Sequence, residues 1–183
     1  MMMVNSITYL FLAFVTSIFS PKPKEKSEEL MDWKSGRPLA WSDYKGTPNP
    51  ESDAAATTTT LVGIEYHIKN NSFSYSIQCR FSKDRSWGLH KTAYILAHEQ
   101  GHFDIAEIYA RKLNKEMEEY RFDRRSYEKD LKKIYSKVMQ EKEDFQNRYD
   151  KETRHSINKE KQYAWLDKID ELLNETADYA DYK

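Results

Sequence analysis

The sequence predicts an α+β domain in which an N-terminal antiparallel β-hairpin, or small sheet, packs on about three helices. Residues 57–81 alternate apolar and polar side chains at a period of two, whereas residues 90–173 space their apolar side chains as a helix does. The chain has 183 residues, which is enough for one ordinary domain. An aromatic content of 14% argues against disorder, because disordered chains contain few aromatic residues.

The composition excludes several classes of function. The 29 basic and 30 acidic residues give a net charge of −1, so we do not expect a dedicated nucleic-acid binder. The single cysteine, Cys79, excludes an intrachain disulfide and any cysteine-rich zinc cluster. What remains is a small polar domain with 5 histidines.

The N-terminal segment predicts where the protein is located. Residues 7–19 carry no charge and are too few for a transmembrane helix, which needs about 20, but they suit a signal-peptide core. We therefore expect residues 1–20 to be a signal peptide or, alternatively, an uncleaved membrane anchor that tethers the protein through residues 7–19. Both interpretations predict an extracytoplasmic protein, whether secreted, periplasmic or membrane-anchored.

The rest of the chain divides into three expected parts. Residues 21–36 are polar and contain prolines, as expected of a linker. Residues 37–176 form the expected domain, and residues 177–183 form a C-terminal tail. Within the domain, residues 37–50 carry Trp41 and Tyr44 among turn-forming residues, which predicts an irregular arm on the core.

A hairpin is expected next. Residues 57–68 and 73–81 are the two strands, and Asn70–Asn71 is the turn between them. The apolar faces are expected to consist of Val62, Ile64, Tyr66 and Ile68 on the first strand and Phe73, Tyr75, Ile77, Cys79 and Phe81 on the second. Helices are expected within residues 90–120, 126–148 and 162–173, with a break at residues 149–156.

The chemically informative string is His98-Glu99-Gln100-Gly101-His102. Two histidines four residues apart lie on one helical face, one turn apart, which is the geometry that two nitrogen ligands need to bind one Zn²⁺. Glu99 follows the first histidine and can act as general base on a water at the metal. This is the HExxH arrangement of zinc peptidases.

A third metal ligand has to come from another segment. On the motif helix the next residues of the ligand face are Ile105, Ala106 and Tyr109, and none of them is a useful zinc ligand. Asp104 and Glu107 point elsewhere; we expect them to orient neighbouring groups or to pair with Arg111.

The expected break at residues 149–156 is the best source of that ligand. We favour His155, with Asp150 or Glu152 as alternatives, and Asp150 could instead hold a ligand imidazole in place. His67 and His90 are interpreted as ordinary residues of a strand surface and a helix entry.

The string HEQGHFDIAEIYARKL, followed by YDKETRH and then by Gln162 and Trp165, resembles a bacterial family of predicted secreted zinc-dependent proteases that is defined by an uncharacterised domain. The upstream strings LAWSDYKGTP and AAATTTT also resemble that family, so the resemblance covers about residues 37–166. It implies His98 and His102 as metal ligands, Glu99 as catalytic acid/base and His155 as third ligand. Ser156 stands where the resemblance leads us to expect glycine.

These observations predict a zinc-dependent metallohydrolase that acts on a peptide or protein substrate, with Glu99 as general base and Tyr149 as a candidate oxyanion donor. Two other hypotheses remain. In the first, a fourth ligand such as Asp150 or Glu152 closes the site, and zinc only stabilises an envelope protein. In the second, the chain is a helical interaction protein and its HExxH string has no chemical role.

Overall fold

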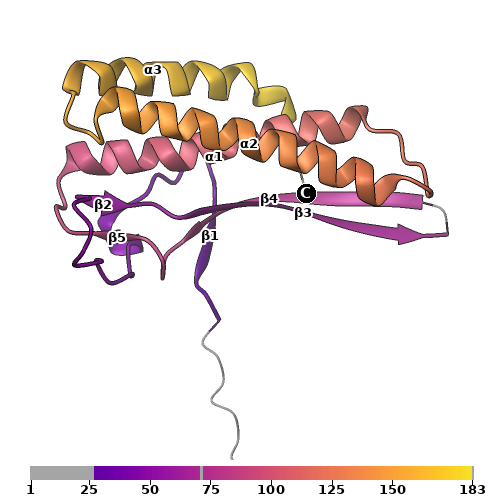
Figure 1. The fold of residues 1–183 in the computed structure, drawn as a ribbon, viewed down its shortest axis with the longest axis horizontal. Helices are drawn as coiled ribbons and strands as arrows, with labels where there is room; N and C mark the ends of the chain where they lie inside the picture. The colour runs from indigo at the N-terminus through magenta and orange to yellow at the C-terminus, as the bar shows by residue number, and fades with distance from the viewer. Residues whose placement is uncertain (1–26, 71, 183) are drawn as a thin grey trace, which may run out of the picture.

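The computed structural model describes residues 27–70 and 72–182, and it confirms the expected α+β class. Three helices lie on one side of a small antiparallel sheet (Figure 1). The helices are α1 (Ala93–Glu119), α2 (Tyr127–Thr153) and α3 (Lys159–Glu175). The strands are β1 (Leu30–Asp32), β2 (Ala56–Thr57), β3 (Thr60–Lys69), β4 (Ser72–Ser82) and β5 (Trp87–Gly88). Two 3₁₀ turns, η1 (Trp41–Asp43) and η2 (Ala177–Tyr179), complete the described elements.

The expected hairpin is present as β3 and β4. The two strands pair from Thr60 opposite Phe81 to Lys69 opposite Ser72, so their apolar faces coincide. Asn70 lies in the turn with a φ of 49°, a left-handed conformation that asparagine tolerates better than most residues. The helices cover this apolar face, and Phe81 at its inner end is fully buried.

The first expected strand, residues 57–68, is divided in the structure. Its start belongs to β2, which pairs with β5 in a separate two-stranded sheet. Thr58 and Thr59 connect β2 to β3, and the Thr59 amide donates to Ser86 Oγ at 2.9 Å. The Ser86 hydroxyl thus takes the place of the backbone carbonyl that would accept this amide in a continuous strand, at the point where the chain passes from one sheet to the other.

Residues 30–32 lie in the expected linker but form β1, the third strand beside β4. Asp32 pairs with Arg80 at 3.0 Å, and Met31 packs against the core. At the other end of the chain, the expected tail contacts the domain, because the Tyr182 hydroxyl donates to Glu107. Single apolar or aromatic side chains anchor both segments, which composition alone did not reveal.

The three helices begin and end close to the expected positions, with one correction. Thr92 caps α1 by accepting the Ile95 amide at 3.1 Å. Helix α2 continues to Thr153 and ends where Arg154 takes a φ of 51°. Tyr149, Asp150 and Glu152 therefore belong to the last turns of α2 and not to a break, which is limited to residues 154–158.

Among the described residues, no helix is both long and apolar enough to cross a membrane. The segment 7–19, on which the signal-peptide and anchor hypotheses depend, lies outside the described residues.

Candidate metal centre

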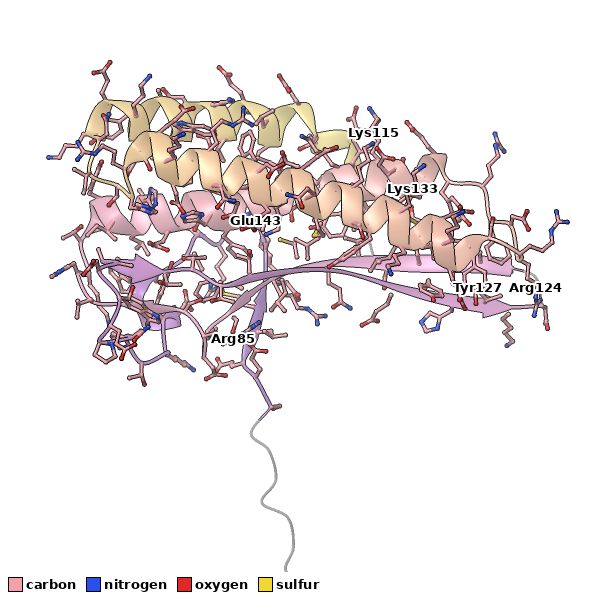
Figure 2. The ribbon with its side chains drawn as sticks, in the orientation of Figure 1. Arg85, Lys115, Arg124, Tyr127, Lys133 and Glu143 are labelled. Carbon is pink, nitrogen blue, oxygen red and sulfur yellow. The ribbon has the colours of Figure 1, made fainter. Side chains whose placement is uncertain are left out.

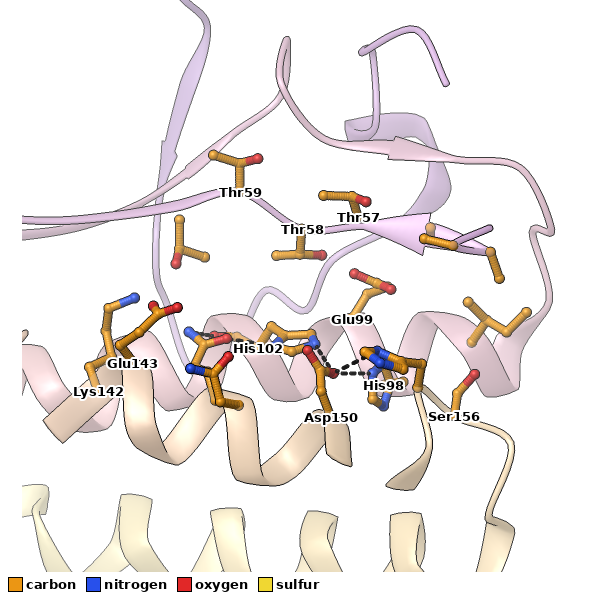
Figure 3. A pocket seen from close by; sticks show the side chains of 18 residues that line it. Thr57, Thr58, Thr59, His98, Glu99, His102, Lys142, Glu143, Asp150 and Ser156 are labelled. Carbon is orange, nitrogen blue, oxygen red and sulfur yellow. Dashed lines mark hydrogen bonds and ion pairs between the residues drawn. The ribbon is translucent and has the colours of Figure 1, made fainter. Parts of the chain in front are cut away.

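His98, His102 and Asp150 lie close together where the N-terminal half of α1 meets the C-terminal end of α2 (Figure 3). The two histidines project from one face of α1, as their spacing predicts. Asp150 Oδ1 from α2 lies 3.1 Å from His98 Nε2 and 3.0 Å from His102 Nε2. One ligand atom from each of the three residues lies within 4.8 Å of the others, so the group could hold a metal ion.

The other sequence candidates lie at different distances from this point. His155 lines the same cleft, but its imidazole is largely exposed and its Nδ1 lies 3.7 Å from Asp150 Oδ1. Glu152 is directed away from the cleft and accepts a hydrogen bond from Trp165 Nε1 at 2.8 Å. Asp104 is on another face of α1, where it accepts from Trp33 Nε1 at 2.7 Å. The structure thus brings together the two motif histidines and Asp150, with His155 beside them.

The hydrogen bonds of His102 indicate that, in the neutral ring, Nε2 carries a lone pair that faces another acceptor and no donor. The Gln146 amide donates through Nε2 to the His102 carbonyl at 3.4 Å, which fixes Oε1 as the atom that faces His102 Nδ1. His102 Nδ1 must then donate, and the second nitrogen of a neutral ring is a bare lone pair. That lone pair would face the Asp150 oxygen 3.0 Å away. Two acceptors at this distance require a second proton on the ring or a cation between them, so the donor set fits a metal ion.

The two imidazoles differ in basicity because their surroundings differ. Burial lowers the pKa of His98, and its hydrogen bond to Asp150 only partly offsets this effect. Burial has the same tendency at His102, but there the hydrogen bond and charge of Asp150 prevail and raise the pKa. Burial alone would raise the pKa of Asp150, yet the two histidines hold it well below its usual range. Asp150 is therefore a carboxylate at neutral pH, as a metal ligand must be.

Glu99 lies next to the metal-binding group and faces the cleft. Its side chain is buried, and its Oε2 has no hydrogen-bond partner among the described residues. Figure 3 shows the carboxylate directed toward the Thr57–Thr58 segment on the opposite wall. A buried carboxylate oxygen without a partner costs free energy, and functional sites are where such costs are retained.

The contact between α1 and α2 positions Asp150 opposite the histidines. Tyr149 is fully buried, stacks on the His98 ring at a centroid distance of 4.6 Å and donates to the His98 carbonyl at 3.1 Å. A Cβ on Gly101 would lie 2.6 Å from the Tyr149 hydroxyl, so only glycine allows this approach. Tyr149 does not line the cleft, so it is a packing residue here and not the oxyanion donor that the sequence suggested.

The cleft has a volume of about 410 Å³ and lies between α1, α2 and the segment 54–60. This opposite wall was not predicted from the sequence, nor were Gln146 and Lys142, which line the cleft from α2. For the α2 residues a signal existed, because Lys142, Gln146 and Asp150 follow one another at a spacing of four. For the wall no signal existed, since its position depends on the pairing of β2 with β5.

Comparison with protein families identifies a group to which the chain can be assigned. A family of bacterial proteins of unknown function, DUF922, matches residues 38–156, more than half of the chain. The chain belongs to this family. The matched segment includes all three members of the metal-binding group as well as Glu99 and His155. No curated protein and no solved structure matches the chain. The DUF922 assignment therefore gives membership without naming a reaction.

Proposed function

We propose that this DUF922 protein is a zinc-dependent metallohydrolase that cleaves peptide bonds outside the cytoplasm. The observation that carries the proposal is the convergence of His98 Nε2, His102 Nε2 and Asp150 Oδ1 beside the unpartnered Glu99 carboxylate. Two imidazoles and one carboxylate are a donor set of catalytic zinc sites, which keep a further position open. Zinc in such a set supplies a Lewis acid and an acidic water at neutral pH.

The residues of this chain would do the remaining work. Glu99 Oε2 is free to accept a proton from a water in the cleft and to return it to a leaving amine. Gln146 holds His102 through both its ring nitrogen and its carbonyl, which fixes the orientation of that imidazole. Burial of His98 and Glu99 keeps bulk water away from the reacting groups.

The opposite wall favours a peptide as substrate. The Leu89 amide donates to the Ala55 carbonyl at 2.8 Å. In this antiparallel pair the backbone N–H and C=O groups of residues 55 and 57 therefore point toward β5. The backbone N–H and C=O groups of Ala56 then point away from β5, and among the described residues β2 has no second neighbouring strand on that side. An extended peptide in the cleft can pair with such an edge.

The experiment that tests the proposal compares zinc content and peptide cleavage in matched variants. We expect one zinc per chain by mass spectrometry and cleavage of a mixed peptide library in the zinc-loaded protein. Glu99→Gln should retain the zinc and lose cleavage by about a hundredfold or more. Glu143→Gln, which changes another carboxylate of the same cleft, should retain both. Zinc binding without cleavage in the parent protein would contradict the hydrolase.

One observation favours a second candidate function, a closed structural zinc site. His155 Nδ1 lies 3.7 Å from Asp150 Oδ1, so a small movement of this exposed imidazole would supply a fourth ligand. In that case His155→Ala would weaken zinc binding and destabilise the fold, and Glu99→Gln would change no measurable property beyond stability. An open site predicts a large effect of Glu99→Gln on cleavage.

A further inference from the structure

Lys142 lies at the end of the cleft away from Asp150, and no acidic group of the described residues forms an ion pair with it. It lines the cleft from α2, where Figure 3 shows its side chain beside that of Glu143. Among the residues that the structure describes, Lys142 has no hydrogen-bond or ion-pair partner. Glu143, which is exposed, acts on it through its charge only.

This ammonium is partly withdrawn from water. Burial lowers the pKa of Lys142, and the charge of Glu143 compensates only part of the effect. A partly buried cation without a partner costs free energy, whereas a lysine at an ordinary surface position extends into water at little cost. The arrangement is favourable once an anion enters the cleft and pairs with the ammonium.

The position of Lys142 relative to the metal-binding group sets the distance to that anion. Lys142 and Asp150 are eight residues apart on α2, which corresponds to about 12 Å along the helix axis. An extended peptide advances about 3.3 Å per residue, so 12 Å spans three to four residues. A peptide along the 54–60 wall with its reacting bond at His98, His102 and Asp150 would therefore bring a side chain of this distance near Lys142.

We propose that Lys142 is a specificity-determining residue that selects peptides with an acidic residue three or four positions from the cleaved bond. This inference rests on the proposed peptide hydrolysis and specifies its substrate class. The acidic side chain pairs with the Lys142 ammonium, and its position in the sequence fixes the register of the peptide in the cleft.

The test measures peptide binding and peptide cleavage separately. Binding is followed by fluorescence anisotropy on full-length Glu99→Gln protein, with and without zinc. The probes are two pools of labelled ten-residue peptides that differ only in having Glu or Gln at one scanned position. We expect the Glu pool to bind roughly tenfold more tightly at its best position, the order of a charge-assisted hydrogen bond. Cleavage by the parent protein should favour the same pool.

Four variants test whether the preference depends on Lys142. Lys142→Gln should reduce the tenfold preference to about onefold, and Lys142→Arg should largely retain it. Lys133→Gln is the matched control, because Lys133 is an exposed lysine of the same helix that lies farther from Glu143 than Lys142 does (Figure 2). This variant should leave the preference unchanged. Glu143→Gln should not lower the preference, since it removes a competing carboxylate.

The outcomes separate this inference from the proposed function. Cleavage of both pools at equal rates, or an acidic preference that survives Lys142→Gln, would overturn the role of Lys142 and leave the hydrolase standing. Binding with a Lys142-dependent acidic preference but no cleavage would support the role of Lys142 and overturn the hydrolase. Failure of both pools to bind would overturn the inference.

Discussion

Asp104 shows how a single carboxyl on α1 makes the stability of the domain depend on pH. It lies away from the cleft and accepts hydrogen bonds from Trp33 Nε1 and Gln100 Nε2, both at 2.7 Å. Gln100, which lies within the HExxH string, also accepts a hydrogen bond from the Leu39 amide through Oε1. This bond links the N-terminal arm to α1. Burial raises the pKa of Asp104 to about 6, and the two hydrogen bonds offset this only partly.

The raised pKa of Asp104 predicts that this residue makes the protein less stable as the pH rises. Between pH 4 and 6 the folded state binds a proton at Asp104 that the unfolded chain does not, so Asp104 lowers the free energy of unfolding as the pH rises through this range. Asp104→Asn keeps an oxygen acceptor without the charge, and should stabilise the protein by about 1–3 kcal/mol at pH 7 and by little at pH 4. Urea unfolding of both proteins at these pH values measures the difference. An equal difference at both values would contradict the prediction.

Ser156 illustrates strain at the turn that follows α2. Arg154, His155 and Ser156 have φ values of 51°, 50° and 69°, and each such conformation is unfavourable for a residue with a Cβ. Glycine, which the sequence resemblance leads us to expect at position 156, has no such penalty. Backbone strain beside His155 is consistent with a turn that is retained for its position next to the metal-binding group.

The second prediction concerns this turn. Ser156→Gly should raise the free energy of unfolding by about 0.5–1 kcal/mol, because relief of the positive φ exceeds the added entropy of the unfolded chain. The midpoint of denaturant unfolding measures the change. Ser156→Ala is the matched control, since it removes the same hydroxyl but keeps the Cβ, and it should give no such gain. A gain of equal size in both variants would assign the effect to the hydroxyl.

At the scale of elements, the packing of α1 against α2 determines whether the metal ligands meet. Gly101 on α1 allows the Tyr149 hydroxyl to approach, and Tyr149 precedes Asp150 on α2. Trp165 of α3 packs against Tyr149 from the other side, at a centroid distance of 5.5 Å, so Tyr149 cannot retreat freely. The third prediction follows from this confinement.

Gly101→Ala should destabilise the protein by about 1–3 kcal/mol and weaken zinc binding, because the new methyl group displaces Tyr149 and with it Asp150. Helix propensity acts in the opposite direction, since alanine favours an α-helix over glycine by about 1 kcal/mol. Gly101→Ala combined with Tyr149→Phe removes the clashing hydroxyl and should recover part of the zinc affinity. Isothermal titration with zinc measures this recovery, and a double variant no better than Gly101→Ala would refute the proposed contact.

The elements also show which parts of the structure the sequence could predict. The hairpin and the three helices have periodic apolar residues, and the His98–His102 pair lies within one helix, so local spacing was sufficient for all of them. The third member of the metal-binding group depends on how α2 ends. Asp150 belongs to a continuous helix because α2 extends to Thr153, a boundary that apolar periodicity did not reveal. The short strands β1, β2 and β5 depend on partners distant in sequence, so local pattern could not locate them.

At the scale of the whole molecule, the metal-binding group connects two helices, α1 and α2, that lie far apart in the sequence. The two histidines belong to α1, which contacts both β3 and β4, whereas Asp150 is 48 residues beyond His102 on α2. A metal ion bound to all three residues links the sheet-bound helix to the outer helices and has no preformed site in the unfolded chain. Its binding free energy therefore adds to the stability of the fold.

The linkage between zinc binding and folding can be measured as a change in thermal stability. At a free zinc concentration of one hundred times the Kd, binding should stabilise the protein by about 2.7 kcal/mol, which raises Tm by roughly 5–10 °C for a domain of this size. Scanning calorimetry with zinc, and again after addition of EDTA, gives the shift and its reversal. Asp150→Asn should unfold at the same temperature with and without zinc, because it removes the carboxylate that completes the group. Lys151→Gln, which changes an exposed neighbour on α2, should retain the shift. A zinc-dependent shift that persists in Asp150→Asn would transfer the third ligand to another residue, and loss of that shift in His155→Ala would identify His155.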